Sequence, residues 1–326
     1  MAPQAATDFA NILKGRVAVI TGAGAGLGRE YALKLAELGA AIVVNDVGHH
    51  VNGTGASASP AQQVVDEITA KGGRAVTNTS SVADWHGAQS IIDSAISNFG
   101  RLDIVVNNAG INRPSSLVDL TEADVDLELS VHLKGTLAVS HFAAAHWSQV
   151  GPSQNRAIIN TTSAAGLHPA AGGGVYGAAK AGIAALTLSH AQELARLGVR
   201  VNAVAPCART RMVLNSPAVA ALMPTSDDFD RHTPDHVAPL VAYLASSLCR
   251  FTGRVFAIEG PDVAIYGSAS VVGEWQTETQ WTLSDLAQAL SNAPNQISSR
   301  AFFPGGPVQH NVPTGRTLKS LGELGK

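Results

Sequence analysis

VAVITGAGAGLGRE, residues 17–30, passes from a short apolar, β-branched run into a loop that contains Gly22, Gly24, Gly26 and Gly28. The run predicts a buried strand, and the residues from Leu27 onward have helical spacing. Glycines at such a junction allow a tight turn and let the backbone approach a pyrophosphate, which the helix N-terminus attracts. The stretch therefore predicts the first strand, phosphate loop and helix of a dinucleotide-binding sheet.

The same alternation of strand and helix continues along the chain. Further apolar runs predict strands at 40–46, 74–82, 102–110, 156–163, 199–206 and 254–260, with helices between them at 61–73, 84–99, 121–149, 175–197 and 234–247. Strands that are apolar throughout are typical of a parallel sheet with helices on both faces. With right-handed crossovers, the pattern predicts a single-domain Rossmann α/β fold, a doubly wound parallel sheet of about seven strands.

The alternation ends near residue 260, so residues 1–260 are predicted to form one domain. Residues 261–326 are richer in Gly, Pro, Ser and Gln. They predict a C-terminal extension with one helix near 282–292, packed on the domain or at an oligomer interface. The loop at 48–60 is longer than most connections, and long ordered loops often serve a site.

Composition limits the classes of protein. Of the 326 residues, 45% are hydrophobic and 14% are charged, which indicates a large core and excludes general disorder. The net charge of -3, with scattered Lys and Arg, gives no basic stripe for nucleic acid or an anionic membrane. No apolar run has the length of a signal peptide or a membrane span, so we expect a cytoplasmic protein.

The two cysteines, Cys207 and Cys249, lie far apart and form no CxxC pair. They indicate neither a disulfide framework nor a zinc site, so we expect reduced, buried thiols and no metal.

Asp46 ends the second predicted strand. A carboxylate at this position accepts hydrogen bonds from an adenosine ribose and repels a 2′-phosphate, which favours NAD over NADP. The alternative is an acid that caps a turn or helix.

Tyr176 and Lys180 stand four residues apart in GGVYGAAKAG, residues 173–182. On a helix they share one face, where the ammonium lowers the pKa of the phenol and gives a proton donor and acceptor near neutral pH. Ser163 ends a strand at the carboxyl edge of the sheet, where ligands bind. The alternatives are a Tyr cap, a Lys on a solvated face and a Ser that enters a turn.

Together these pieces resemble the short-chain dehydrogenase/reductase family over residues 14–260. The matching motifs are TGAGAGLG at 21–28, NNAG at 107–110, Ser163, and YGAAK at 176–180. The resemblance implies that Tyr176 exchanges a proton with the substrate oxygen, which Ser163 hydrogen-bonds. It also implies that Lys180 holds the nicotinamide ribose and lowers the tyrosine pKa, which makes residues 1–260 the NAD-binding and catalytic domain.

The resemblance further implies a set of cofactor-binding residues in the loops that follow the strands. They are Gly22, Gly24, Gly26, Leu27, Gly28, Asp46, Ser81, Val82, Asn108, Ala109, Gly110, Tyr176, Lys180, Pro206, Ala208 and Thr210. Asn107 and Gly110 match the segment that lines the cofactor crevice, whereas Asn108 and Ala109 are interpreted as mainly structural.

Two features depart from the common family pattern. His132 stands where many members have asparagine, and we expect it to satisfy a backbone carbonyl rather than relay protons. The segment PCARTRM, 206–212, replaces the usual Pro-Gly loop and is one residue shorter. With the VVND strand and the VHLKGT helix, these features resemble the (3R)-hydroxyacyl-CoA dehydrogenase portion of multifunctional β-oxidation enzymes. Bacterial single-domain relatives, including ones that act on steroid side-chain thioesters, are similar.

The leading hypothesis is NAD-dependent oxidation of the 3-hydroxyl of a hydroxyacyl-CoA. A 3-oxoacyl thioester reductase and a hydroxysteroid or carbonyl reductase are alternatives, since they share fold and catalytic residues. A non-catalytic NAD-binding module is disfavoured because Tyr176 and Lys180 are both present.

The Ala-rich helix at 175–197 is apolar on more than one face, which predicts burial on more than one side. A partner subunit could cover one of these sides, and the family resemblance implies a homodimer or homotetramer formed through this helix and the helix at 121–149. The loop at 207–235 is predicted to form a substrate lid, and the tail at 295–326 to close a neighbouring site, support the oligomer or be disordered.

Overall fold

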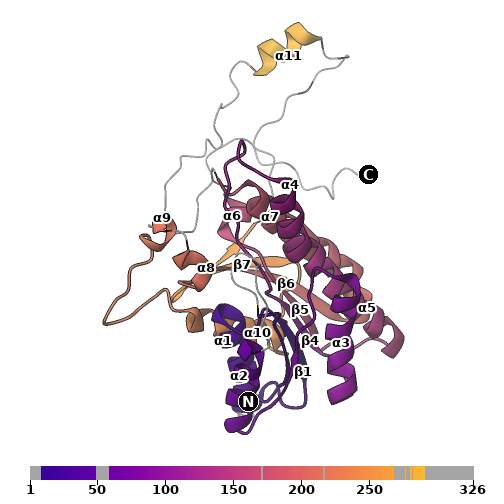
Figure 1. Ribbon diagram of the computed structural model, residues 1–326. Coiled ribbons are helices and arrows are strands. Elements are labelled where there is room, and N and C mark those ends of the chain that lie inside the picture. The colour runs from indigo at the N-terminus through magenta and orange to yellow at the C-terminus, as the bar shows by residue number, and fades with distance from the viewer. Residues whose placement is uncertain are drawn as a thin grey trace, which may run out of the picture. The chain divides into compact units, whose positions relative to one another are not determined.

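The computed structural model describes residues 9–48, 59–169, 172–215, 217–267, 276, 280 and 282–290. Within this part of the chain, eight strands form one sheet in the order β3-β2-β1-β4-β5-β6-β7-β8 (Figure 1). The strands are β1 Val17–Thr21, β2 Ala41–Asn45, β3 Arg74–Asn78, β4 Ile104–Asn107, β5 Arg156–Thr161, β6 Val199–Cys207, β7 Arg254–Glu259 and β8 Asp262–Tyr266. The first seven are parallel, as predicted, and confirm the doubly wound fold.

The eighth strand was not predicted. It returns antiparallel to β7 after a tight turn at Gly260, whose φ is +53°. Residues 262–266 were predicted to belong to the C-terminal extension. A hairpin needs only a tight turn, so no crossover helix precedes β8 to mark it in the sequence.

Helices cover both faces of the sheet. The longer helices are α1 Gly26–Glu37, α2 Ser59–Ala70, α3 Trp85–Phe99, α4 Glu122–Leu129, α5 Gly135–Val150, α7 Gly174–Glu193 and α10 Ala238–Ala245. The short ones are η1 Phe9–Asn11, α6 Ala164–Leu167, η3 Ala195–Leu197, α8 Arg211–Leu214, α9 Pro217–Ala220 and η4 Pro234–Val237. The predicted long helices are thus confirmed, with small differences at their ends.

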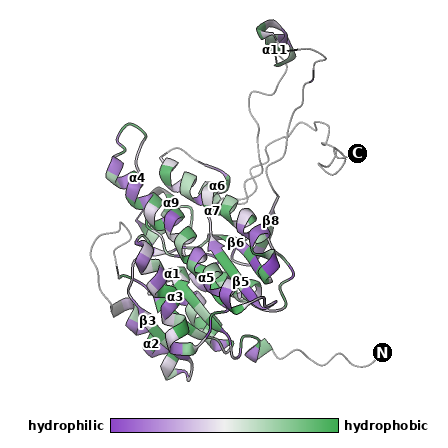
Figure 2. Ribbon diagram, turned by 90° about the vertical axis from the view of Figure 1, so that its right-hand side faces the viewer, coloured by the Kyte–Doolittle hydropathy of each residue, from purple (hydrophilic) through white to green (hydrophobic). Residues whose placement is uncertain are grey.

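Two hydrophobic cores lie on the two faces of the sheet. Ala18 and Ile20 of β1 join α1, α2 and α10 in one core, whereas Val17 and Val19 join α3 and α5 in the other. Because neighbouring residues of a strand point to opposite faces, a strand covered on both sides must be apolar throughout. Figure 2 shows the resulting hydrophobic strands between helices of mixed hydropathy.

The helix predicted at 121–149 is interrupted by a turn of π-helix, η2 Ser130–Lys134, between α4 and α5. Such bulges rotate the residues on either side and are frequent at functional sites. His132 lies within this turn and is fully buried.

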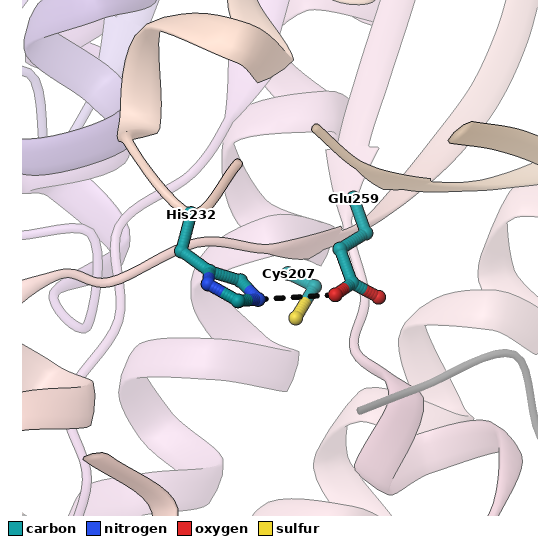
Figure 3. A group of neighbouring side chains, drawn as sticks. All are labelled: Cys207, His232 and Glu259. Atoms are coloured by element: carbon teal, nitrogen blue, oxygen red, sulfur yellow. Dashed lines mark hydrogen bonds and ion pairs between the residues drawn. The ribbon is translucent and has the colours of Figure 1, made fainter. Parts of the chain in front are cut away.

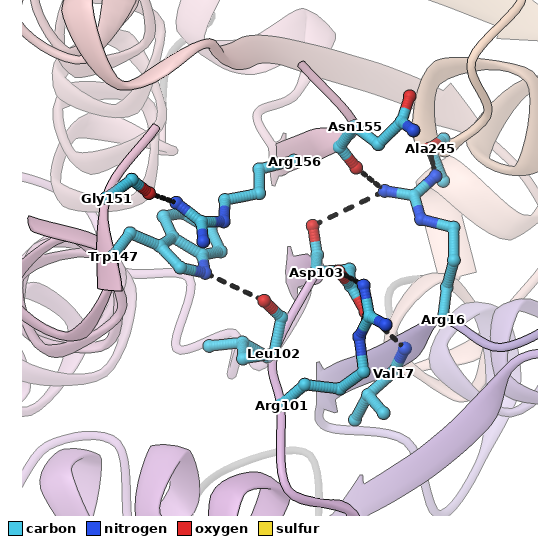
Figure 4. Close-up of polar contacts among 10 residues, drawn as sticks. All are labelled: Arg16, Val17, Arg101, Leu102, Asp103, Trp147, Gly151, Asn155, Arg156 and Ala245. Carbon is cyan, nitrogen blue, oxygen red and sulfur yellow. Dashed lines mark hydrogen bonds and ion pairs between the residues drawn. The ribbon is translucent and has the colours of Figure 1, made fainter. Parts of the chain in front are cut away.

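Polar contacts close the amino-terminal edge of the sheet (Figure 4). Arg16 donates to the carbonyl oxygens of Ala245 and Asn155, and burial lowers its pKa to about 10. The Asp103 carboxylate accepts from the Val17 amide at 2.9 Å and from Arg101 at 2.7 and 2.8 Å. These contacts fasten the strand ends far from the carboxyl edge, where ligands bind in such sheets.

The chain divides into two compact units, Met1–Tyr266 and Gly267–Lys326. The first contains the whole sheet. In the second, the predicted helix is present as α11 Leu283–Leu290. Residues 49–58 of the long loop and the tail at 295–326 lie outside the described residues, so their roles stay predictions. Among the described helices, none combines the length and apolar character needed to cross a membrane.

Candidate functional site

The candidate site lies at the carboxyl edge of the sheet. The strand β1 pairs with both β2 and β4, so the direction in which strands are added reverses at β1. In open α/β sheets, ligands bind outside the strand ends at this switch point. The loop that joins β1 to α1 contains Gly22 and Gly26, with φ values of +64° and +54°. Only glycine adopts such values without strain, which explains why the loop is glycine-rich.

Asn108 and Ala109 hold this loop from the neighbouring strand. The side-chain amide of Asn108 donates to the carbonyl oxygens of Thr21 and Gly22, both at 3.0 Å. The backbone amides of Asn108 and Ala109 both donate to the Thr21 hydroxyl at 3.0 Å. These contacts agree with the structural role predicted for the two residues. Asn107 instead donates to Ser140 and Asn160 within the core.

The loop leaves no room for larger side chains. A Cβ at Gly28 would lie 2.2 Å from the Gly22 carbonyl oxygen and 2.5 Å from the side-chain amide nitrogen, Nδ2, of Asn108. A Cβ at Gly22 would lie 2.8 Å from the Ala109 Cα. The backbone is therefore bare and closely approachable, as a pyrophosphate at the N-terminus of α1 requires.

We expect Gly28→Ala to destabilise the protein by about 3 kcal/mol or more, since the new methyl group meets backbone that cannot rotate away. NADH binding should be lost with the loop geometry. Urea unfolding and a fluorescence titration with NADH check both effects. Gly174→Ala is the control, because a Cβ there meets nothing within 4 Å, and its stability should change by no more than about 0.5 kcal/mol. Equal stability of the two variants would contradict the prediction.

Asp46 follows β2 and lies against the glycine loop. Its carboxylate accepts from the Gly24 amide at 2.8 Å and from the Gly48 amide at 2.7 Å. A carboxylate has about four acceptor positions, so two stay available for ribose hydroxyls. Arg29, the basic residue next to the loop, pairs with Glu30 and Glu67 at 2.5 Å each.

Ser163, Tyr176 and Lys180 come together where β5 ends and α7 begins. The Ser163 hydroxyl accepts from the Ala165 amide at 3.2 Å, and its interaction with the phenol lowers the pKa of Tyr176. The Lys180 ammonium lies 5.6 Å from the centroid of the Tyr176 ring and donates to the Thr161 carbonyl oxygen at 2.7 Å. Lys180 is only 3% exposed, and burial lowers its pKa to about 7.

The tyrosine pKa differs from the sequence-based expectation. Burial raises the pKa of Tyr176, the Ser163 hydrogen bond lowers it, and the charge of Glu128 raises it further. The Lys180 ammonium lies over the ring, 5.6 Å from its centroid, and in the protein alone burial of the phenol outweighs any lowering of its pKa. The protein alone therefore favours the protonated phenol.

His132 behaves as predicted from the sequence. Its Nε2 lies 2.8 Å from the Ile111 carbonyl oxygen, which confirms that it satisfies a backbone group. Burial, and then the charge of Lys180, lower its pKa to about 3, so the ring is neutral. The ring packs edge-on against Tyr176 with centroids 5.2 Å apart. His132 also closes the space over Gly110, where a Cβ would lie 2.6 Å from its Cε1.

The other predicted cofactor residues surround the same edge. Val82 is buried against Gly135, and the Ser81 hydroxyl accepts from the Ala83 amide. After β6, Thr210 reaches the glycine loop, since a Cβ at Gly26 would lie 3.7 Å from its Cγ2. Three predicted cofactor-binding residues remain. Leu27 packs against one hydrophobic core, Ala208 is buried, and Pro206 of β6 is partly exposed.

Glu128 was not singled out from the sequence. Its side chain is 2% exposed, and one carboxylate oxygen accepts from the Arg113 amide at 2.7 Å. It lies one helical turn before His132, and burial raises its pKa. Only its four-residue spacing from His132 could have suggested that it faces the site.

These features fit a nicotinamide cofactor. The bare glycine loop suits a pyrophosphate, Asp46 suits a ribose, and Lys180 offers a buried ammonium with donors to spare beside the tyrosine.

Known proteins resemble this chain over most of its length. A family model described as short chain dehydrogenase matches residues 16–218. Hydroxyacyl-CoA dehydrogenase ChsB1 of Mycobacterium tuberculosis is 40% identical over 85% of this chain and 88% of its own. Peroxisomal multifunctional enzyme type 2 of Mus musculus is 39% identical over 75% of this chain, but over only 31% of its own length.

Solved structures agree. A short chain dehydrogenase from Mycobacterium avium is 41% identical with a TM-score of 0.76, and the match covers 88% of this chain and 98% of that one. A Burkholderia cenocepacia short chain dehydrogenase in complex with NADP has a TM-score of 0.67 at 32% identity, covering 77% and 98%. A 7α-hydroxysteroid dehydrogenase with NADH has 0.69 at 28% identity, covering 78% and 98%.

The fold, the motifs and these relatives agree with one another, and two of the three solved structures are complexes with a nicotinamide cofactor. The chain belongs to the short-chain dehydrogenase/reductase family and is an oxidoreductase with hydroxyacyl-CoA dehydrogenases among its relatives.

Proposed function

We propose that this protein oxidises the 3-hydroxyl of a hydroxyacyl-CoA to a ketone with NAD. The observation that carries the cofactor assignment is the Asp46 carboxylate, fixed against the glycine loop by the Gly24 and Gly48 amides. The substrate class is supported by the likeness to a hydroxyacyl-CoA dehydrogenase over most of both chains. The resemblance to the (3R)-hydroxyacyl-CoA dehydrogenase branch adds the stereochemistry.

In this proposal, Tyr176 is the catalytic base of the oxidation and Ser163 positions the reacting oxygen. The Tyr176 phenolate would take the hydroxyl proton, and a bound nicotinamide cofactor would accept the hydride from the same carbon, which balances as a ketone, a protonated tyrosine and NADH. Bound NAD⁺ supplies the hydride acceptor and a positive ring charge that favours the phenolate. The Lys180 ammonium has further protons with which to hold the ribose.

Glu128 opposes the ionisation of Tyr176. The other groups facing this phenol are Ser163, His132, which stays neutral above about pH 3, and Lys180. We expect Glu128→Gln to remove a negative charge and so lower the tyrosine pKa, while the amide oxygen still accepts from Arg113. The rising limb of kcat/KM for oxidation against pH should move to lower pH. Glu122→Gln, on the exposed surface of the same helix, should leave it in place.

An unchanged limb in Glu128→Gln would contradict this electrostatic role. A loss of activity at all pH values, without a shift, would instead indicate a purely structural role.

The test of the proposed function is NADH formation with a panel of hydroxyacyl-CoAs. The panel contains (3R) and (3S) forms, short to long chains, and one thioester with a steroid ring system. Turnover of (3R) or steroid-linked thioesters supports the proposal. If only the reverse reaction of a 3-oxoacyl thioester with NADPH is found, the protein is a reductase of synthesis. If only a free steroid alcohol reacts, the hydroxysteroid assignment replaces it.

A further inference from the structure

Three side chains of the kinds that bind transition metals meet beside the candidate site. Cys207 and Glu259 are the last residues of β6 and β7, and they are direct neighbours in the parallel register. His232 comes from the segment just before η4. One ligand atom from each lies within 4.8 Å of the other two. Figure 3 shows the imidazole and the carboxylate pointing toward each other, with the thiol beside the gap between them.

The group is buried and incompletely hydrogen-bonded. Cys207 and His232 are each 5% exposed. His232 Nε2 lies 3.0 Å from a Glu259 oxygen, but its buried Nδ1 has no hydrogen-bond partner among the described residues. No described residue hydrogen-bonds the Cys207 thiol, whereas the other buried thiol, Cys249, donates to the Phe251 carbonyl oxygen at 3.6 Å. A thiol aimed at an imidazole and a carboxylate without bonding either needs an explanation.

We propose that Cys207, His232 and Glu259 bind a zinc ion, with water as the fourth ligand. Zinc takes thiolate, imidazole and carboxylate ligands at about 2.0–2.3 Å, which places neighbouring ligand atoms of a tetrahedral site roughly 3.3–3.6 Å apart. Here the ligand atoms of the three residues lie within 4.8 Å of one another, so the metal would draw them closer together. A thiolate ligand also selects against Mg²⁺ and Ca²⁺, which prefer oxygen.

Charges at the site balance when the metal is present. A thiolate and a carboxylate offset the two positive charges of the ion, and the imidazole stays neutral. Binding at Cys207 would displace the thiol proton to solvent, because the thiolate is the form that ligates a metal. Arg231 forms an ion pair with Glu259 at 3.4 Å and another with Asp262 at 2.5 Å. If Glu259 bound the metal, Arg231 would therefore keep Asp262 as a partner.

The ion would fasten the base of the predicted substrate lid. Cys207 and His232 flank the loop at 208–231, whose ends are already joined by the ion pair between Arg209 and Asp230. Arg209 also donates to the carbonyl oxygens of Met223 and Pro224 within the loop. A metal bound at Cys207 and His232 would add a second closure and tie both ends to β7. The three residues lie far apart in the sequence, which is why no metal motif was visible there.

The test is a Co²⁺ titration of metal-free, full-length protein, followed by absorbance for thiolate-to-cobalt charge transfer. Zinc content of the purified protein is measured by mass spectrometry in parallel. The variants are Cys207→Ser and His232→Gln. Cys249→Ser is the matched control, because Cys249 is 4% exposed and belongs to no group of metal ligands among the described residues. No substrate is needed, so the result is independent of the proposed function.

We expect the wild type and Cys249→Ser to bind about one Co²⁺ per chain with a thiolate band, and Zn²⁺ to displace it. Cys207→Ser should lose the band, and both site variants should bind Co²⁺ at least 100-fold more weakly. Absence of stoichiometric binding in the wild type would overturn the proposal, whatever the variants do. Equal Co²⁺ uptake by Cys207→Ser and Cys249→Ser would overturn it as well.

Discussion

Tyr176→Phe is expected to lower kcat for alcohol oxidation by about 10³-fold, within the range that general acid–base groups contribute. The substitution removes only the hydroxyl that we propose exchanges a proton with the substrate. The phenylalanine ring keeps the edge-on contact with His132 and the position of Lys180 above it. Affinity for NADH and stability should therefore stay close to those of the wild type. Steady-state rates with a hydroxyacyl-CoA, with an NADH fluorescence titration, measure the two effects separately.

Tyr243→Phe is the control for this change, since Tyr243 lies in α10 and packs against a core on the other side of the sheet from α3 and α5. It should retain full activity. Retention of more than about a tenth of wild-type kcat by Tyr176→Phe would remove Tyr176 from the role of catalytic base.

Asp46→Asn is expected to reduce the proposed preference for NAD over NADP by about 100-fold, measured as the ratio of the two kcat/KM values. Hydrogen bonds to a charged group contribute about 1.5–3 kcal/mol each, and those from the ribose of NAD would weaken. The same substitution removes the negative charge that repels the 2′-phosphate of NADP. Both effects change the ratio in the same direction.

Asp66→Asn is the matched control, because Asp66 is an exposed acid. Its carboxylate accepts a hydrogen bond from the Gln62 side chain on the same helix. Its cofactor preference should equal that of the wild type. A wild type that prefers NADP, or an Asp46→Asn variant with an unchanged ratio, would contradict the assignment of Asp46.

Local patterns explain why much of the fold was predictable. The glycine loop, the apolar strands and the spacing of Tyr176 from Lys180 each depend on residues close together in the sequence. The strand β8 was missed because a tight turn replaced the usual crossover helix. The turn of π-helix at His132 was missed as well, since the composition of Ser130–Lys134 does not distinguish it from α-helix.

The features of the site that were not predicted depend on interactions between residues far apart in the sequence. Glu128 affects Tyr176 through space, and its burial depends on how α4 packs. The raised tyrosine pKa follows from burial, which no residue spacing reveals. Cys207, His232 and Glu259 meet only because β6 and β7 are paired and the segment just before η4 returns to their ends.

The most direct test is the rate of NADH formation when wild-type enzyme meets NAD and one (3R)-3-hydroxyacyl-CoA, with Tyr176→Phe beside it. We predict steady NADH formation by the wild type and much slower or no formation with the (3S) enantiomer. In Tyr176→Phe the rate should fall by about 10³-fold. No NADH from either enantiomer, at any chain length, would contradict the hydroxyacyl-CoA assignment, and equal rates in wild type and variant would contradict the proposed chemistry.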